Sequence, residues 1–268
     1  MKTDTGFIHN GPVRIHYERS GGGLAPIVLC HGITDNGRCL LRLAEHLAGR
    51  FEVVFYDARG HGRSDAPSTG YTANDHAGDL AALVDTLGLE DPILYGHSMG
   101  ARTVVRLAAQ QPGLPRALVL EDPVYLLPPT PEQAEAYQQW HRVMPEVLHG
   151  WQARSDPERL ALAKEQGFKD WREADQVEWA QSKIQVRPQV FEMGDTMTTI
   201  SADFEHIPCP TLILKADADP DTQAQHEAVV ARLPRGEIVH IPGAGHNVRR
   251  DNWAATIDHL NRFLALLR

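Results

Sequence analysis

The chain has 268 residues, and its 26 Lys and Arg against 35 Asp and Glu give a formal net charge of −9. A nucleic-acid-binding surface needs clustered basic residues, and no run of five or more Lys and Arg occurs here, so nucleic acid is excluded as an expected partner. Hydrophobic residues make up 42% of the chain, enough to form the sizeable core of one large domain or two small ones.

Short apolar runs separated by turn residues predict seven β-strands. The first, 13–18, alternates between apolar and polar residues, whereas the others are continuously apolar, as parallel strands buried on both faces are. These six runs are 27–30, 53–56, 93–95, 118–120, 212–214 and 238–241. Helical patterns lie between several of them, which indicates βαβ units and a mostly parallel sheet.

Three segments predict helices that flank this sheet. Residues 72–75 (TAND) resemble a capping box, and apolar residues at helical spacing follow as far as Gly88. Residues 99–110 and 253–267 carry the same periodicity.

The strand pattern stops after Asp122 and resumes at Thr211. The residues between them form amphipathic stretches at 132–148 and 171–186, and they include four of the five tryptophans. These are Trp140, Trp151, Trp171 and Trp179. We interpret 124–205 as a helical insertion in a sheet domain formed by 1–123 and 206–268.

Three cysteines, Cys30, Cys39 and Cys209, are an odd number at unrelated spacings, which favours free thiols over a disulfide framework or a metal site. The first ten residues lack the basic start and apolar run of a secretory signal. No stretch approaches the ~18 apolar residues of a membrane span. We therefore expect a cytoplasmic protein with no membrane partner.

Residues 96–100 match the G-x-S-x-G pattern, in which a serine serves as a nucleophile. The pattern follows the apolar run 93–95 and opens the helical run 99–110, which is the strand, turn and helix that a nucleophile elbow requires. The Ser98 hydroxyl is then expected at the carboxyl edge of the sheet, where open α/β sheets bind ligands.

A serine hydroxyl needs a base within hydrogen-bonding distance. Among fourteen histidines, His246 follows the last predicted strand in a glycine-containing loop (GAGH), so its imidazole can reach the same edge. His97 is next to Ser98 in sequence, but its side chain should point away, and we interpret it as a packing residue. His31, which precedes Gly32, is interpreted as structural.

Two aspartates can orient the histidine and stabilise its charged form. Asp219 follows the strand at 212–214 and gives the chain order Ser, Asp, His. Asp122, after the strand at 118–120, is the alternative. We favour Asp219 and interpret Asp217 as a capping or turn residue. The alternation Asp217, Asp219, Asp221 lacks the glycine and glutamate of a calcium loop, so no metal is expected.

Negative charge on a tetrahedral intermediate needs N–H donors that already point toward it. The residue after the nucleophile supplies one donor, the N–H of Met99. The loop after the strand at 27–30 supplies another, and within His31-Gly32-Ile33-Thr34 the favoured donor is the N–H of Ile33.

Together these motifs resemble the α/β hydrolase superfamily: His31-Gly32, the block at 57–64, 96–100, Asp219 and Gly245-His246. The resemblance implies an eight-stranded, mostly parallel sheet with a helical lid at 124–205, inserted after the sixth strand. It also implies a triad of Ser98, His246 and Asp219 that needs no cofactor. The block at 57–64 is similar to a structural turn of the family, so no catalysis is assigned to His61 or Asp65.

The same resemblance reduces the number of reaction types to expect. Haloalkane dehalogenases and epoxide hydrolases of this fold use an aspartate where this chain has Ser98. The loop at 31–37 (HGITDNG) departs from the glycine-rich loop of the carbon–carbon hydrolases. We expect a hydrolase of a small or medium carboxylic ester, and the lid tryptophans suggest a hydrophobic acyl or aryl group. Lactone hydrolysis, carbon–carbon cleavage, perhydrolysis and a ligand receptor on the same scaffold are the alternatives.

Overall fold

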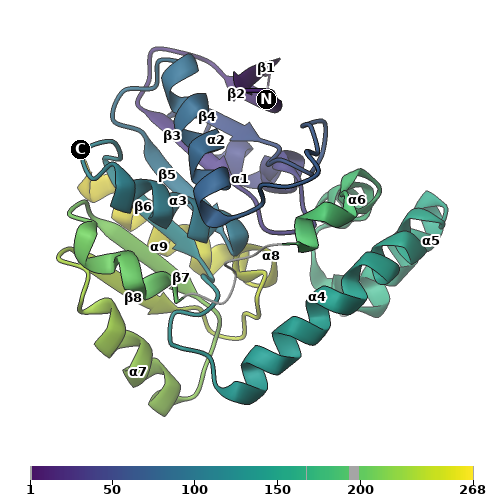
Figure 1. Cartoon of the computed structure of the whole chain (residues 1–268). Coiled ribbons are helices and arrows are strands. Elements are labelled where there is room, and N and C mark those ends of the chain that lie inside the picture. The colour runs from purple at the N-terminus through teal and green to yellow at the C-terminus, as the bar shows by residue number, and fades with distance from the viewer. Residues whose placement is uncertain (1, 167, 193–198, 268) are drawn as a thin grey trace.

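The computed structural model describes residues 2–166, 168–192 and 199–267. Eight strands form one sheet in the order β1-β2-β4-β3-β5-β6-β7-β8 (Figure 1). Their bounds are β1 Asp4–Asn10, β2 Val13–Ser20, β3 Pro26–Cys30, β4 Glu52–Tyr56, β5 Ile93–His97, β6 Ala117–Glu121, β7 Thr211–Lys215 and β8 Gly236–His240. The first two pairings, β1 with β2 and β2 with β4, are antiparallel, and the rest are parallel. The predicted eight-stranded, mostly parallel sheet is confirmed.

The seven predicted runs all fall in strands except for Ile241, which follows β8, and the eighth strand, β1, was not predicted from its sequence. Its residues are mostly polar and exposed because it lies at one edge of the sheet and pairs only with β2. The expectation that 238–241 is buried on both faces was wrong. Residues 238–240 belong to β8, the opposite edge strand, whose residues are exposed or half-buried, and only Ile241, after the strand, is buried.

Helices cover both faces of the sheet, and alternate residues of each central strand point to opposite faces. Val28 and Val54 pack with α2 and α3 in one core cluster, whereas Leu29 and Phe55 pack with α1 and α9 in the other. The helices and short 3₁₀ turn of this domain are η1 Gly37–Leu40, α1 Leu41–Leu47, α2 Ala73–Thr86, α3 Met99–Gln110, α7 Pro220–Val230, α8 Val248–Asp251 and α9 Trp253–Leu266. The capping box that the sequence predicts before α2 is formed by Thr72 and Asp75.

Between β6 and β7 the described residues form helices and 3₁₀ turns. They are α4 Pro131–Gln152, α5 Asp156–Glu165, η2 Phe168–Asp170, α6 Glu173–Ser182, η3 Lys183–Gln185, η4 Pro188–Phe191 and η5 Ile200–His206. Helices α4, α5 and α6 gather on one side of the sheet (Figure 1). We call α4 to η4 the inserted helices; their action as a lid stays a prediction.

The three cysteines are buried and unpaired with one another, as the sequence predicts. Within the described ranges, no helix combines the length and the apolar character needed to cross a membrane.

Candidate active site

Ser98 occupies the sharp turn between β5 and α3. Its backbone has φ 53° and ψ −110°, a conformation that costs energy and is found mainly at functional sites. The flanking glycines are required by close contacts. A Cβ on Gly96 would lie 2.3 Å from the Gly100 carbonyl oxygen, and one on Gly100 would lie 2.2 Å from the Cys30 carbonyl oxygen. The turn therefore holds Ser98 at the carboxyl end of β5.

His246 lies between Ser98 and an aspartate, and it makes a hydrogen bond with each ring nitrogen. Nε2 is 3.0 Å from Ser98 Oγ, and Nδ1 is 2.5 Å from Oδ2 of Asp122. Because a carboxylate only accepts, Nδ1 carries the proton and donates to Asp122, which leaves Nε2 free to accept from the Ser98 hydroxyl. This order of partners can convert the hydroxyl into a nucleophile.

Asp122 follows the last residue of β6 and has a left-handed backbone, with φ 38°. Its N–H donates to Leu214 O at 2.8 Å, which ties the turn to β7. Burial raises the pKa of Asp122, but the hydrogen bond from His246 and the charge of Lys215 lower it further, so the pKa lies well below its ordinary value. The group is therefore a carboxylate at neutral pH.

The prediction of Asp219 as the orienting acid was wrong, and the alternative, Asp122, is the partner of His246. Asp219 is the N-cap of α7, where its carboxylate accepts from the N–H of Thr222 at 3.0 Å and from its hydroxyl at 2.7 Å. Pro220 follows at the first helical position, a common arrangement at helix starts. Asp217 lies in the loop between β7 and α7 and accepts from the N–H of Gly243 at 2.8 Å.

His97 is closer to the site than the sequence predicts. It is buried, its ring centroid lies 5.0 Å from that of His246, and its Nε2 donates to the His246 carbonyl at 2.9 Å. Burial lowers the pKa of His97 to about 4, so the ring is neutral at pH 7. His97 is thus a buried packing residue, as expected, and it also supports the backbone of His246.

His31 and the block at 57–64 make the structural contacts that the sequence predicts. The Nδ1–H of His31 donates to Gly32 O at 2.8 Å, and its Nε2 accepts from Ala58 N at 3.0 Å. The Asp57 carboxylate closes its turn by accepting from the N–H groups of Gly37 and Arg63 at 2.8 and 2.9 Å.

A cavity of about 370 Å³ opens above Ser98, between the sheet and the inserted helices. It is lined by Gly32, Ile33, Thr34, Asp35, His97, Ser98, Met99, Arg102, Val124, Tyr137, Trp140, Trp179, His246 and Asn247. Both predicted oxyanion donors, Ile33 and Met99, are therefore on its wall. Their binding of an oxyanion stays a prediction.

Two of the four tryptophans in 124–205 reach this cavity, Trp140 from α4 and Trp179 from α6. Trp171 is buried elsewhere and donates from Nε1 to Asp251 at 2.7 Å, while Trp151 packs edge-on against Trp179. The cavity thus has an aromatic wall that comes from the inserted helices.

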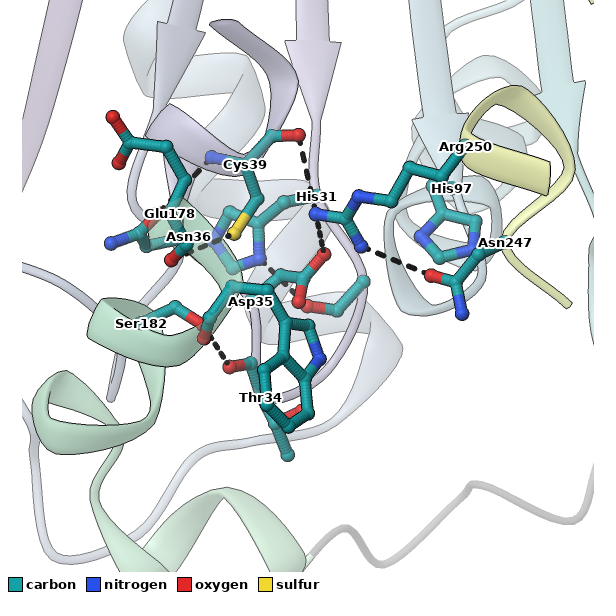
Figure 2. A network of polar contacts seen from close by, with 12 residues as sticks. His31, Thr34, Asp35, Asn36, Cys39, His97, Glu178, Ser182, Asn247 and Arg250 are labelled. Atoms are coloured by element: carbon teal, nitrogen blue, oxygen red, sulfur yellow. Dashed lines mark hydrogen bonds and ion pairs between the residues drawn. The ribbon is translucent and has the colours of Figure 1, made fainter. Parts of the chain in front are cut away.

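The loop that carries Ile33 is held by the inserted helices through Thr34, which has φ 67°. The Thr34 carbonyl accepts from Ser182 Oγ at 3.1 Å and from Lys183 Nζ at 2.8 Å. Figure 2 shows this loop, with Ser182 pointing toward Thr34. The two residues after Ile33 already use their N–H groups: Thr34 donates to His61 Nε2, and Asp35 donates to the Gly32 carbonyl.

Asp35 joins the same loop to two buried cations. Its carboxylate lies 3.2 Å from Lys183 Nζ. It also lies 3.0 Å from Arg250 Nη2, as Figure 2 shows. Burial raises the pKa of Asp35, but the charges of Arg250 and Lys183 outweigh it, and the pKa lies well below the ordinary value. Burial lowers the pKa of Lys183. Sequence reasoning missed this cluster because Lys183 is 148 positions from Asp35.

No group of three or more His, Cys, Asp and Glu side chains that could hold a metal ion is found in the part of the chain that the structure describes.

The sequence and the structure were also compared with known proteins. The model of the Alpha/beta hydrolase family matches residues 27–259. The sn-1-specific diacylglycerol lipase ABHD11 of Mus musculus is 30% identical over 267 residues, which cover 95% of this chain and 86% of that protein.

Another relative is the 2-(acetamidomethylene)succinate hydrolase of Mesorhizobium japonicum, 44% identical over 113 residues. That match covers 42% of this chain and spans only 40% of the relative's length. A crystal structure of E-2-(acetamidomethylene)succinate hydrolase covers 98% of this chain and 100% of its own, with a TM-score of 0.80 and 25% identity.

Proposed function

Because this chain belongs to the α/β hydrolase family, we propose that it is a serine hydrolase that cleaves a small or medium carboxylic ester through an acyl-enzyme. The observation that carries the proposal is the hydrogen-bonded series from Ser98 through His246 to Asp122. A serine hydroxyl paired with a histidine that a buried, ionised aspartate orients is the arrangement that nucleophilic acyl transfer uses.

In the proposed mechanism Ser98 Oγ attacks the ester carbonyl, and His246 Nε2 takes the hydroxyl proton. Asp122 stabilises the imidazolium that forms. The N–H groups of Ile33 and Met99 bind the oxyanion, and His246 then protonates the leaving alcohol. Water attacks the acyl-enzyme with His246 as base, which releases the acid and restores Ser98.

The cavity supports a substrate with a hydrophobic acyl or aryl group. Val124, Tyr137, Trp140 and Trp179 provide apolar and aromatic surface, and about 370 Å³ lies within the size range of small-molecule sites. An ester of a short or medium acid fits this lining.

The experiment is hydrolysis of p-nitrophenyl acetate and butyrate by the wild-type protein, Ser98→Ala and a control, Ser68→Ala. Ser68 is exposed and outside the cavity. We expect Ser98→Ala to lower kcat/KM by more than about 1,000-fold and Ser68→Ala to leave it unchanged, because Ser98 alone forms the acyl-enzyme. Full activity of Ser98→Ala would overturn the proposal.

The alternatives give different results in the same series. Turnover of lactones, diketones or peroxide in preference to esters favours the corresponding hydrolase or perhydrolase chemistry. Rapid labelling of Ser98 by a fluorophosphonate, without turnover of any ester, favours a ligand receptor.

A second candidate is hydrolysis of an amide that carries a carboxylate, and Arg102 is the observation that favours it. Arg102 lies one helical turn after Ser98 on α3, is buried, and lines the cavity. A guanidinium has five N–H donors and binds carboxylates in a bidentate manner. One relative is named 2-(acetamidomethylene)succinate hydrolase, and the compound in that name contains both an amide and carboxylates.

A matched pair of esters tests this candidate. Monomethyl succinate is anionic and dimethyl succinate is neutral, so their ratio of KM values measures recognition of the charge. We expect Arg102→Met to raise KM at least ~10-fold for the anionic ester and to leave the neutral one unchanged, because a charge-assisted pair is lost. Equal effects on both esters would exclude this role of Arg102.

A further inference from the structure

The orienting aspartate has a second charged partner. Lys215, the last residue of β7, places its Nζ 2.5 Å from Asp122 Oδ1 and 3.1 Å from the Pro123 carbonyl. The N–H of Ala216 also donates to Oδ1, at 3.2 Å. The other oxygen, Oδ2, is the one that faces His246. Each carboxylate oxygen therefore has its own partners.

We propose that Lys215 is a positioning residue of the site: its ammonium holds Asp122 with Oδ2 toward His246 and weakens the pull of that carboxylate on the imidazolium. The inference rests on the proposed function, in which His246 must be neutral to accept the Ser98 proton. A carboxylate paired with an ammonium attracts a nearby cation less than an unpaired carboxylate does. Lys215 thus extends the active range of the enzyme toward lower pH.

The ion pair between Lys215 and Asp122 is largely buried. Its side chain is 14% exposed, and that of Asp122 is 8% exposed, so solvent screens their interaction weakly. The Lys215 ammonium is held against Asp122 by its hydrogen bonds. If the Lys215 side chain rotated away, the buried Oδ1 of Asp122 would keep only the N–H of Ala216 as a partner.

The other titratable groups around the pair come from several elements. His226 of α7 and His240 of β8 face Lys215, and burial together with the Lys215 charge lowers the pKa of each, to about 4 for His226. Both are neutral at pH 7, as is His97 beside His246. The charged groups farther out are Asp217, Asp219 and Glu227 near these histidines, Glu121 and Arg249 near His97, and Asp35 and Arg102 on the cavity wall.

A second cavity, of about 800 Å³, gives room for substitution at Lys215. Lys215 and His226 line it together with Tyr125, Thr130 and Tyr137, and Ser98 is not among its lining residues. A longer arginine or an uncharged methionine can extend into this space without displacing the sheet. Variants at this position therefore test the charge of Lys215 more than its volume.

The experiment is an NMR titration of the His246 imidazole in the wild type, Lys215→Met and Lys215→Arg. The His246 signal is identified by its absence in His246→Gln. Lys164→Met, at an exposed position of α5, is the matched control. We expect the pKa of His246 to rise by about 1 unit in Lys215→Met and to stay near the wild-type value in Lys215→Arg and Lys164→Met.

An unchanged or lowered pKa of His246 in Lys215→Met would overturn the inference. If Lys215→Met does not fold, Lys215→Gln removes the same charge, and its His246 titration tests the inference in the same way. A merely structural role of Lys215 predicts loss of thermal stability without a shift of the His246 titration.

Activity supplies the second readout. The acid limb of kcat/KM for p-nitrophenyl acetate should move up by the same ~1 unit in Lys215→Met, with kcat lowered and KM unchanged. The two proposals fail differently. A shifted titration without any ester turnover refutes only the proposed function, whereas Ser98-dependent turnover with coincident pH profiles refutes only the role of Lys215.

Discussion

Asp122 reaches His246 from β6, the strand that lies directly beside β5 and Ser98. Asp219 follows β7, which lies one strand farther from β5, and its carboxylate caps the N-terminus of α7. The two aspartates therefore resemble each other in sequence context and differ in their contacts. Their roles can be separated by removing one charge at a time without changing side-chain shape.

We expect Asp122→Asn to lower kcat by about 10⁴-fold, because an amide cannot hold His246 in the tautomer that accepts a proton. Asp219→Asn should change kcat less than about twofold, since asparagine is an equally good N-cap. Steady-state hydrolysis of p-nitrophenyl acetate measures both, with thermal unfolding to check that each variant is folded. A large loss of activity in Asp219→Asn alone would contradict the assignment.

The inserted helices contribute more than a cavity wall, since they also grip the loop that carries Ile33. Lys183 of η3 donates to the Thr34 carbonyl, the Thr34 hydroxyl at 3.0 Å and the Asp35 carboxylate. Arg38 of η1, which follows the loop, and Glu178 of α6 form a second link at 2.9 Å, but Arg38 is 45% exposed. The first contact is buried and the second faces solvent, so their energies should differ.

Replacing Lys183 by methionine should lower the free energy of unfolding by about 3 kcal/mol, because it leaves the buried Asp35 with one cation in place of two. It should also lower kcat more than it raises KM, since the loop bearing the Ile33 donor loses three hydrogen bonds. Arg38→Ala should cost less than about 1 kcal/mol. Urea unfolding and ester kinetics on both variants check these values, and equal costs would contradict the ranking.

Most elements follow from local pattern. The buried runs predict β3 to β7, and the capping box and apolar spacing predict α2, because these signals act within a few residues. Strand β1 lacks an apolar run because it is exposed at an edge. The choice between Asp122 and Asp219 depends on the order of β5, β6 and β7 in the sheet, which no local pattern encodes. The Lys183–Asp35 contact is likewise set by how the inserted helices pack.

Across the whole molecule, the site lies where the carboxyl ends of the central strands meet the inserted helices. The ends of β5 and β6 supply Ser98 and Asp122, and the inserted helices supply Trp140, Trp179 and the contacts to Thr34. In the proposed function, chemistry and substrate choice are thus carried by different parts of the chain. The fold also buries several histidines, His97 at this site and His76 on α2 among them, and that burial links overall stability to pH.

His76 and His97 are fully buried, and burial lowers the pKa of each to about 4 from an ordinary 6.5. Below pH 6.5 the unfolded chain binds a proton at each position while the folded protein does not, so stability falls as pH decreases from 6.5 toward 4. At pH 5 each histidine should cost about 2 kcal/mol relative to pH 8.

Urea unfolding at pH 8, 6.5 and 5 measures this loss, in a range where ordinary carboxylates stay ionised in both states. His76→Gln removes one of the two buried sites, so its stability should fall by about 2 kcal/mol less than that of the wild type between pH 8 and pH 5. The comparison is made within each variant across pH, which cancels any constant cost of the substitution. Parallel pH curves for the two proteins would contradict the linkage to His76, because a histidine that titrates alike in both states contributes no slope.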